Sequence, residues 1–400
     1  MKATTLGALC TGGDALLQTG PFGSQLHAHE YSADGVAVVM PRDIRAGQLD
    51  LREAAHIPPV TASRLRRHSL RAGDIVYSRR GDVEKCALVH ERNLPAICGT
   101  GSLLVRVNRD EAVPGYVAHR LNHEDTRKWI RQHAVGATMP NLNTQILANV
   151  PLQVPPLPEQ QAIAEVLGAL DDKIAVNSSV EVNLEQLLRA EFQGVLQASE
   201  HSQPLGSLVR LNPPRPSPKR LAPQIPMQAL PTPGLTVRQP DLGVPNGGVR
   251  FMNGDTVMAR ITPCLENGKT AYISCLAEGE VGFGSTEYIV FRSRDGFPLP
   301  LSYFIATDPT FRDVAIQRMV GSSGRQRVKA SDLESAGVRM TTDPTKLRWF
   351  GEVATKRIEL AQSLARESQT LAALRDTLLS PLMDGTLRVK DAIRHAEDVL

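Results

Sequence analysis

The chain contains one internal repeat, and this feature restricts its possible folds more than any other. Residues 71–79 and 252–260 share the pattern Gly-Asp-x-Val-x-x-Arg at a shift of 181 residues. Two further pairs of glycine-led strings recur at shifts of 183 and 185, namely Gly99–Ser102 with Gly282–Ser285 and Gly136 with Gly321. Short loop insertions between equivalent elements produce such a slowly drifting shift. The repeat therefore predicts two similar globules.

Each globule is predicted to be a mixture of strands and helices. Runs rich in β-branched and aromatic residues, such as 73–78, 102–107 and 287–292, alternate with glycine-rich turns, as expected of short strands. We predict an α+β fold in which two similar mixed α/β globules are each followed by a helical segment. The predicted boundaries are 1–155 and 201–345 for the globules, and 156–200 and 346–400 for the helical segments.

Both helical segments carry an apolar seam. Pro158 and Glu159 stand where helix starts favour proline and acidic residues. Positions reached by alternate steps of four and three residues are mostly apolar, which favours pairing of the two long helices in the manner of a coiled coil. The predicted interface comprises Ile163, Leu167, Leu170, Ile174, Leu184, Leu188, Phe350, Val353, Leu360, Leu364, Leu371, Leu374 and Leu378. In the alternative that stays open, each helix packs only on its own globule.

Charge is distributed unevenly along the chain, although its net value is only +3. Residues 1–155 carry 18 basic and 14 acidic side chains, and residues 201–345 carry 16 and 12. Residues 156–200 carry 2 basic and 8 acidic side chains. Because a bound polyanion responds to local charge, the globules are predicted to approach it and the first helical segment is not.

Composition indicates a folded protein of a reducing compartment. A hydrophobic content of 42% over 400 residues can fill more than one core. The cysteines stand too far apart for a disulfide framework or a zinc site: Cys10, Cys86, Cys98, Cys264 and Cys275. No stretch approaches the roughly 18 apolar residues of a membrane span, and no secretory signal is evident. We expect a cytoplasmic location.

Two glycine-led polar loops, 136–143 and 321–327, occupy equivalent places in the repeat but differ in content. Arginine and lysine bind phosphates and guanine edges, while Asn, Gln, Ser and Thr suit other base and water-mediated contacts. The predicted DNA-binding residues of the first globule are Ser24, Gln25, His27, Arg64, Arg66, Arg67, Ser78, Arg79, Arg80, Asn141 and Asn143. Those of the second are Lys219, Arg220, Arg260, Ser323, Arg325, Gln326, Arg327 and Lys329.

Catalytic patterns are weak, and we predict no catalytic residue, metal or resident cofactor. Residues 212–215 imitate the Asn-Pro-Pro-aromatic loop of adenine methyltransferases, but arginine stands where the aromatic ring should be. The carboxylates of 82–85 and 171–173 could hold magnesium, yet such runs are usually solvated. His27 and His29 lack a third ligand.

Several strings resemble the specificity (S) subunits of type I restriction-modification systems, the HsdS family. They are Gly20-Pro-Phe-Gly-Ser24, His29-Glu-Tyr31, Gly35-Val36, Pro155-Pro-Leu-Pro-Glu-Gln160, Leu170-Asp-Asp-Lys-Ile174, the run Gly254–Lys269, and Gly282-Phe-Gly-Ser-Thr-Glu287. The resemblance extends over nearly the whole chain, and its specificity lies in the combination.

The resemblance implies two target-recognition domains, 1–155 and 201–345, that each read one half of a bipartite site on double-stranded DNA. It implies that the two helices form an antiparallel pair, set the gap between the half-sites and dock two modification subunits, which would carry S-adenosylmethionine. A restriction (translocase) subunit would add cleavage. Two alternatives stay open: a self-contained adenine DNA methyltransferase, and an adaptor whose helices recruit protein partners without DNA.

Overall fold

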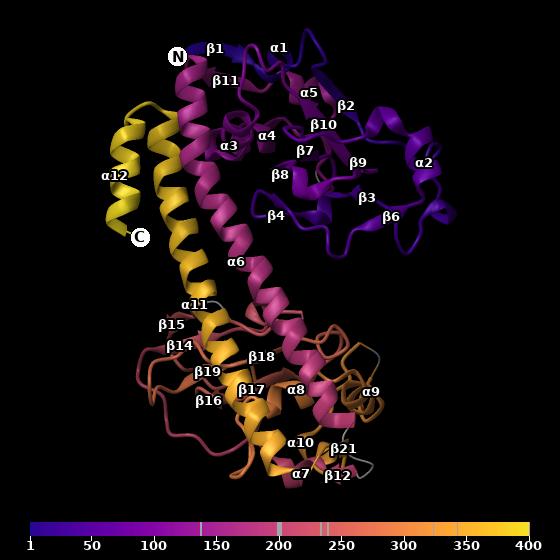
Figure 1. Ribbon diagram of the computed structural model, residues 1–400, viewed down its shortest axis with the longest axis vertical. Coiled ribbons are helices and arrows are strands. Elements are labelled where there is room, and N and C mark those ends of the chain that lie inside the picture. The colour runs from indigo at the N-terminus through magenta and orange to yellow at the C-terminus, as the bar shows by residue number, and fades with distance from the viewer. Residues whose placement is uncertain are drawn as a thin grey trace. The chain divides into compact units, whose positions relative to one another are not determined.

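The computed structural model describes residues 1–136, 138–197, 202–232, 234–237, 240–322, 324–341 and 343–399. These residues form two compact units. Unit 1 combines Met1–Asp171 with Ala373–Leu400, and unit 2 comprises Asp172–Ala372. Two long helices, α6 (Leu157–Gln197) and α11 (Pro344–Met383), contribute to both units (Figure 1).

Unit 1 is built around two small sheets. The first has the strand order β2-β10-β7-β8, with all neighbours antiparallel: Leu16–Thr19, Ser102–Arg106, Ile75–Ser78 and Cys86–Leu88. The second has the order β6-β3-β9, where β3 and β9 are parallel: Ala55–Ile57, Val36–Val39 and Ala96–Cys98. The residues of β7 are all buried, which is why this strand reads as a nearly continuous apolar run.

Unit 2 repeats this plan. Its first sheet has the order β13-β20-β17-β18: Val209–Leu211, Tyr288–Ser293, Thr256–Ala259 and Thr270–Tyr272. Its second has the order β15-β14-β19-β16, where β14 and β19 are parallel: Asp241–Gly243, Ala222–Ile225, Gly282–Gly284 and Arg250–Phe251. The first sheets have the same strand order, and each second sheet contains a parallel pair with an antiparallel strand beside its first member, to which unit 2 adds β16. This correspondence confirms the predicted internal repeat and the α+β fold.

A strand pair joins the two ends of each globular part. In unit 1, β1 (Lys2–Thr5) pairs with β11 (Pro151–Val154). In unit 2, β12 (Ser202–Pro204) pairs with β21 (Gly337–Arg339). Both pairs are antiparallel, so the chain enters and leaves each globular part at one place.

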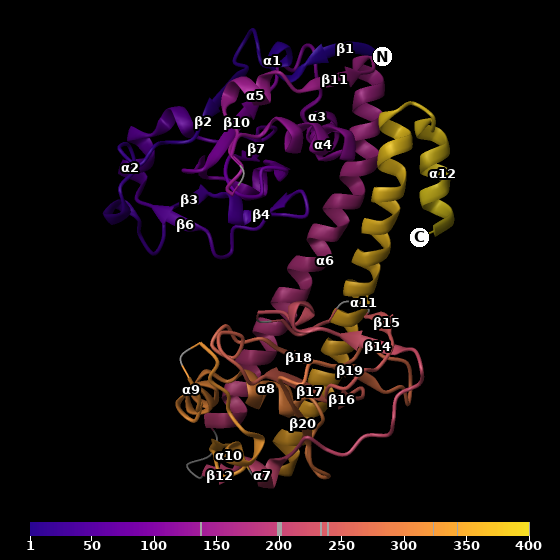
Figure 2. The same cartoon turned by 180° about the vertical axis from the view of Figure 1, so that it is seen from behind.

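Helices cover the sheets in equivalent places. Unit 1 has α3 (Pro114–Asn122), α4 (Glu124–His133) and α5 (Thr144–Ala148), and unit 2 has α8 (Leu301–Thr307), α9 (Pro309–Gln317) and α10 (Ala330–Leu333). Helix α8 is buried along its length and packs on β17, β18 and β20 (Figure 2). The remaining short elements are α1 (Leu6–Leu9), α2 (Pro59–Arg64), α7 (Leu205–Leu208), β4 (Ile44–Arg45) and β5 (Gln48–Leu49). No helix in the described ranges is long and apolar enough to cross a membrane.

The start of α6 is fastened to unit 1 by a buried glutamine. The side chain of Gln160 is 1% exposed, and its Oε1 accepts a hydrogen bond of 2.9 Å from the amide of Val113. Its Nε2 donates to the carbonyl of Pro155 over 2.9 Å. Further along, Asp171 of α6 pairs with Arg375 of α11 at 2.7 Å. These contacts fix both helices on the globular part of unit 1.

In unit 2 the two helices run antiparallel. Asn177 of α6 is 1% exposed and donates to the Glu367 carboxylate of α11 at 2.8 Å. Further toward the C-terminus of α6, Glu191 pairs with Arg357, which lies closer to the N-terminus of α11, at 2.6 Å. From the first contact to the second, residue numbers rise along α6 and fall along α11, so the two helices are antiparallel.

The buried face of α11 in unit 2 differs from the predicted seam. Phe350 is fully buried, but Leu360 is 48% exposed, so the prediction that Leu360 lies in the helix interface is wrong. Ala354, Ile358 and Ala361 are buried instead. Steps of four from Phe350 to Ile358 replace the alternation of four and three, because the helix curves onto a globular core and not only onto a partner helix.

Most other predicted seam residues are buried: Ile163, Leu167, Leu170, Leu188, Phe350, Leu371, Leu374 and Leu378. Ile174, Leu184, Val353 and Leu364 are partly buried. In unit 2, Leu188 and Phe350 belong to the same core as Phe304 of α8, and Leu184 and Val353 pack against this core. The helices thus pair with each other and also complete the core of the globular part, which combines the two alternatives considered for the sequence.

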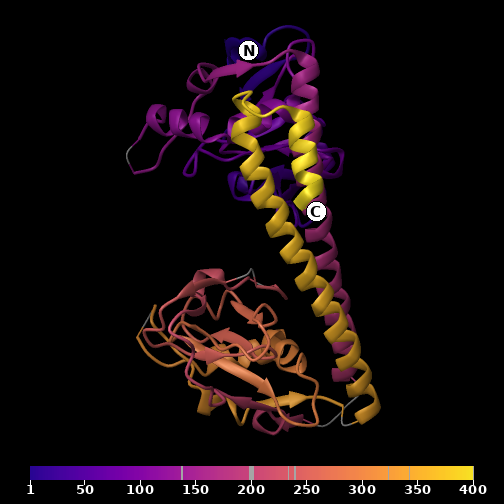
Figure 3. The same ribbon diagram turned by 90° about the vertical axis from the view of Figure 1, so that its left-hand side faces the viewer.

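The C-terminal segment contains two helices. Helix α11 ends at Met383, and Gly385 follows with a φ of +73°, a conformation that glycine adopts without strain. The chain then turns into α12 (Val389–Val399), which lies beside the end of α11 within unit 1 (Figure 3). The segment predicted as one C-terminal helix is therefore divided by a turn.

Candidate nucleic-acid interface

The repeated Gly-Asp turn holds a buried carboxylate in each unit. In unit 1, Asp74 is 1% exposed and accepts a hydrogen bond of 2.8 Å from the amide of Arg71. The guanidinium of Arg106, on the neighbouring strand β10, binds the same carboxylate through Nε at 2.6 Å and Nη2 at 2.7 Å. This bidentate pair ties β7 to β10.

Unit 2 repeats this pair and adds a second arginine. Asp255 is fully buried and accepts a hydrogen bond of 2.8 Å from the amide of Met252. Arg292 of β20 binds it at 2.9 Å, and Nε of Arg215 donates to it at 3.1 Å. Gly73 and Gly254 have φ values of +92° and +87°, which explains why glycine precedes both aspartates. The repeated Gly-Asp is therefore structural.

The string Asn212-Pro-Pro-Arg215 also has a structural role. Oδ1 of Asn212 accepts a hydrogen bond of 2.9 Å from the amide of Val290, and Arg215 is engaged by Asp255. A base-holding loop would need its asparagine amide and its fourth side chain free to meet a base. Here both are committed to the fold.

The arginine that ends the repeated motif occupies the same position in both units. The amide of Arg79 donates to the carbonyl of Gly101 at 2.8 Å, and that of Arg260 donates to the carbonyl of Glu287 at 3.0 Å. Because the backbone contacts match, the two arginines are equivalent, and so are Gly101 and Glu287. The pairing of Gly99–Ser102 with Gly282–Ser285 predicted from the sequence is therefore wrong by three residues, because the strands that follow pair Ser102 with Ser78 and Tyr288 with Ala259. What differs is the chemistry of the side chains around them.

The two predicted loops lie beside these arginines, and each is closed by a reciprocal pair of backbone hydrogen bonds. In unit 1, Val135 and Asn141 exchange two backbone hydrogen bonds of 3.0 and 2.9 Å. In unit 2, Val320 and Arg327 exchange two of 2.9 Å. Bridges connect Asn141 to the strand end at Arg80, and Arg327 to the residue after Arg260. Equivalent loops thus carry different side chains at one place in a repeated scaffold.

In unit 1 the site centres on Arg79 and an aromatic ring. The Arg79 guanidinium lies 5.3 Å from the centroid of the Phe22 ring, within cation–π range. Its Nε and the Oδ1 of Asn141 are buried atoms without a hydrogen-bond partner among the described residues. Burial, aided by nearby Arg80, lowers the pKa of Arg79 from its usual value. Unmet donors and acceptors of this kind are suited to an incoming polar ligand.

In unit 2 the site centres on a carboxylate. Arg327 binds Glu287 through Nε at 2.9 Å and Nη2 at 2.8 Å, and Arg260 binds it through Nε at 3.2 Å. The hydrogen bond from Arg327 is the main reason why the pKa of Glu287 lies below its usual value. Arg327 is therefore an ion-paired side chain, whereas the sequence suggested a free one.

The predicted DNA-binding residues fall into groups by exposure. Exposed residues are Ser24, His27, Arg64, Arg66, Arg67, Arg80, Asn143, Lys219, Arg220, Arg325 and Lys329, while Gln25, Arg79, Asn141, Arg260, Gln326 and Arg327 are partly exposed. Ser323 lies outside the described residues. Arg64 pairs with Glu30, and the rings of His27 and His29 stack at 5.5 Å.

Two of these residues have structural roles that the sequence did not reveal. Ser78 is fully buried in β7, so its side chain offers no group to a DNA surface. Asn143 caps α5 by accepting a hydrogen bond of 2.7 Å from the amide of Ile146. In both cases a polar side chain serves the backbone of the unit.

Sequence reasoning missed Phe22 and Glu287. Both lie in strings that carry the family resemblance, but neither is among the predicted DNA-binding residues. An aromatic residue in a glycine-rich loop is itself a signal of base stacking, and Phe22 is 46% exposed. Glu287 is acidic, whereas DNA contacts are expected of basic and amide side chains. Its place directly after a glycine-led turn, opposite the motif arginine, could have identified it.

The carboxylates considered for metal binding are paired with basic groups. Asp82 lies 3.0 Å from Lys85, and Glu84 binds Arg127 and Arg131. One further group, His123 with Asp125 and Asp384, has possible ligand atoms within 4.8 Å of one another. Both ring nitrogens of this histidine are engaged, Nδ1 by the amide of Asp125 and Nε2 by the Ser380 hydroxyl. The group fastens α4 to α11.

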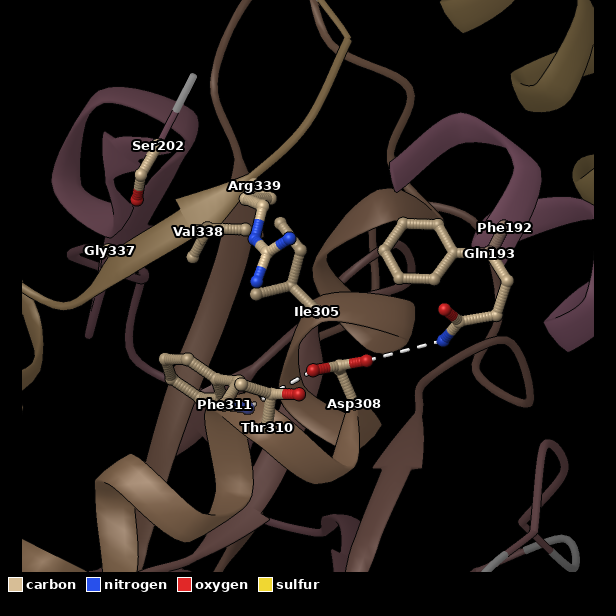
Figure 4. A pocket seen from close by; sticks show the side chains of 10 residues that line it. All are labelled: Phe192, Gln193, Ser202, Ile305, Asp308, Thr310, Phe311, Gly337, Val338 and Arg339. Carbon is tan, nitrogen blue, oxygen red and sulfur yellow. Dashed lines mark hydrogen bonds between the residues drawn. The ribbon is translucent and has the colours of Figure 1, made fainter. Parts of the chain in front are cut away.

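A cavity of about 470 Å³ lies in unit 2 between the end of α6 and α9 (Figure 4). Phe192 and Phe311 form apolar walls, and Asp308 is its acidic group. One Asp308 oxygen caps α9 through the amide of Phe311, and the other accepts from Gln193. Its carboxylate is thus already used by the fold.

Residues 69–186 match the family described as the type I restriction modification DNA specificity domain. Within this part the chain is similar to type I specificity subunits. It is 32% identical over 147 residues to the type I restriction enzyme EcoEI specificity subunit of Escherichia coli, an alignment that covers 35% of this chain and 24% of that protein.

A second relative is the putative MjaX specificity subunit of Methanocaldococcus jannaschii, 25% identical over 155 residues, with 37% and 36% of the two chains covered. The matched part thus spans about a quarter to a third of these relatives. The crystal structure of the S subunit of a type I restriction-modification system from M. genitalium has the same fold, with a TM-score of 0.58, 15% identity and 95% of both chains covered.

Proposed function

We propose that the chain is the DNA-specificity subunit of a type I restriction-modification complex, in which each unit reads one half of a bipartite target. The observation that carries the proposal is the pair of equivalent loops, 135–141 and 320–327, on matching scaffolds with different side chains. Two recognition domains of the same fold that bind different half-sites need the same backbone scaffold and different DNA-contacting side chains. Both globular segments carry excess positive charge, as a phosphate-binding surface requires.

The helices are proposed to dock modification subunits, two of them if the repeat of the chain is matched by its partners. In unit 2 their outer surface carries large apolar side chains that remain accessible: Val176 at 57%, Leu187 at 52%, Trp349 at 51% and Leu360 at 48%. Apolar groups concentrated on exposed helices are typical of protein interfaces. The segment 156–200 is acidic, which favours a protein partner over DNA.

We also propose that chemistry is supplied by partners. In this arrangement a modification subunit carries S-adenosylmethionine and methylates adenine, a restriction subunit translocates and cleaves, and the assembly works in the cytoplasm. The commitment of Asn212 and Arg215 to structural contacts disfavours a resident methyltransferase loop. The role left to this chain is recognition.

The test is to purify the chain with and without a co-expressed type I modification subunit and to map methylated adenines on genomic DNA. We expect methylation at one bipartite sequence with a fixed unread gap, only when the partner is present. Methyl transfer by the chain alone would favour the self-contained methyltransferase. An assembled complex that binds DNA no better than background would favour the adaptor.

A further inference from the structure

The Glu287 cluster in unit 2 places an acidic side chain where a DNA-binding surface is expected to be basic. Glu287 joins Arg260 on the strand end to Arg327 on the loop, and its side chain is 22% exposed. The two arginines are 32% and 41% exposed, so their remaining edges reach solvent. One carboxylate and two guanidiniums leave a net charge of +1 at this site.

The carboxylate has two physical effects on its arginines. It restricts their rotamers before DNA arrives, because each guanidinium is bound to the same carboxylate, and arginine otherwise loses much conformational freedom on binding. It also reduces the attraction of the site for any phosphate, because a bound DNA backbone would lie close to a fixed negative charge.

We propose that Glu287 is a positioning residue that determines specificity for the half-site read by unit 2. It holds Arg260 and Arg327 in the arrangement that fits the edges of the correct bases. It also disfavours sequence-independent contacts of the same arginines with phosphates. This inference rests on the proposed function and assigns a role within it to one acidic side chain.

Unit 1 gives an internal comparison. The residue equivalent to Glu287 is Gly101, and the equivalent arginine, Arg79, stacks on Phe22. The loop residue in the place of Arg327 is Asn141, which bridges Arg80, the residue after Arg79. A carboxylate is thus present where a strand-end arginine and a loop arginine both bind it, and glycine replaces it where the loop has asparagine at that place. The carboxylate accompanies the loop arginine, as expected if it positions that side chain.

The test uses the assembled complex with Glu287→Gln, which keeps the shape of the side chain and removes its charge. We expect binding to random DNA to strengthen and to depend more steeply on salt. Discrimination against single-base changes should fall about tenfold in the unit 2 half-site, within the usual range for one bidentate contact. The unit 1 half-site should be read as before.

Two further variants separate this role from a fold defect. Glu266→Gln removes one exposed carboxylate elsewhere in unit 2 and controls for the change in net charge. Arg327→Gln should also lower discrimination at the unit 2 half-site, but it should weaken binding to random DNA. A general loss of folding would lower both quantities together for both variants, and melting temperatures report it directly.

The inference is overturned if the wild-type complex recognises its bipartite site and Glu287→Gln does so with unchanged discrimination. It is also overturned if Glu266→Gln has the same effect as Glu287→Gln, or if Arg327→Gln leaves the unit 2 half-site unaffected. If the wild-type complex recognises no bipartite site, the proposed function itself fails.

Discussion

The two units share the same backbone scaffold and differ in the side chains around the motif arginine. Asp74 and Asp255 are both buried and both bound by an arginine of the central strand, and the backbone contacts of Arg79 and Arg260 coincide. In unit 1, however, the motif arginine lies on an aromatic ring, whereas in unit 2 it shares a carboxylate with a loop arginine.

This difference separates structural from variable positions. The residues that recur at the same place serve backbone conformation or buried charge pairing, where few alternatives are tolerated. The residues that differ lie where the loop meets the strand end and are at least partly exposed. Recognition can therefore change in one unit without a change in its core.

The largest expected effect concerns the buried aspartates. Asp255→Ala should lower the free energy of unfolding by about 3–5 kcal/mol, because it leaves two guanidiniums in a buried site without their counter-charge. Asp74→Ala should cost less, because only Arg106 is left. Asp295→Ala, a control at a carboxylate that is 96% exposed, should change it by less than about 0.5 kcal/mol. Urea denaturation measures all three, and equal losses for Asp74 and Asp295 would contradict the equivalence of the two turns.

The next effect tests the division of recognition between the units. Replacing both Arg325 and Arg327 by alanine should weaken or relax recognition of one half-site by about one to two orders of magnitude, as expected for loss of base contacts of roughly 1–3 kcal/mol. Arg79→Ala should do the same for the other half-site only. Binding assays with single-base variants of each half-site provide the readout. An equal loss of discrimination at both half-sites from either variant would contradict the division of recognition between the units.

A further variant isolates the type of contact made by the unit 2 loop. Arg325→Lys with Arg327→Lys keeps the charge but removes the planar fork of arginine. If the arginines contact guanine, discrimination should fall as in the alanine variant while the salt dependence stays near that of the wild type. Preserved discrimination would show that these side chains bind phosphates only.

Insertions in the helices test whether α6 and α11 set the gap between the half-sites, because they leave the proposed DNA-binding loops unchanged. Seven residues inserted after Asn177, with seven more in α11 next to Leu364, lengthen each helix by roughly 10 Å and keep the apolar face nearly in phase. We expect the unread gap to grow by about two to three base pairs while the half-site sequences stay the same. Methylation mapping reads out the gap, and a stable, assembled variant that methylates only the original spacing would falsify this role of the helices.

The smallest effect is a different response of the units to acid. Burial lowers the pKa of His68, His119 and His123 in unit 1, so the folded unit binds fewer protons than the unfolded chain. Their contribution to stability is complete above the unfolded pKa of about 6.5 and is lost as the pH falls below it. Unit 2 has one histidine, His201. Amide hydrogen exchange at pH 7.5 and 5.5 should show a larger loss of protection in unit 1, and equal losses would oppose this explanation.

The sequence predicted the repeated backbone scaffold better than the side-chain geometry of the site. Gly73 and Asp74 were recognisable because their roles, a positive φ and a buried charge, tolerate few substitutions and so recur as a visible repeat. The face of α11 was predicted less well, since Ala354 and Ala361 are weak hydrophobic signals that a pattern of large residues such as Leu360 overrides. Glu287 was missed because its role depends on Arg327, forty residues away, and only the folded chain brings them together.

The strand pairs β1 with β11 and β12 with β21 have a consequence for how such a chain can change over generations. Because each pair places the first and last residues of a globular part side by side, that part is joined to the rest of the chain at one place and can be exchanged as one segment. Under the proposed function, recombination at these two ends would exchange a whole recognition surface and leave the helices unchanged. New combinations of half-sites would then arise in single genetic events, without intermediates that recognise no DNA sequence.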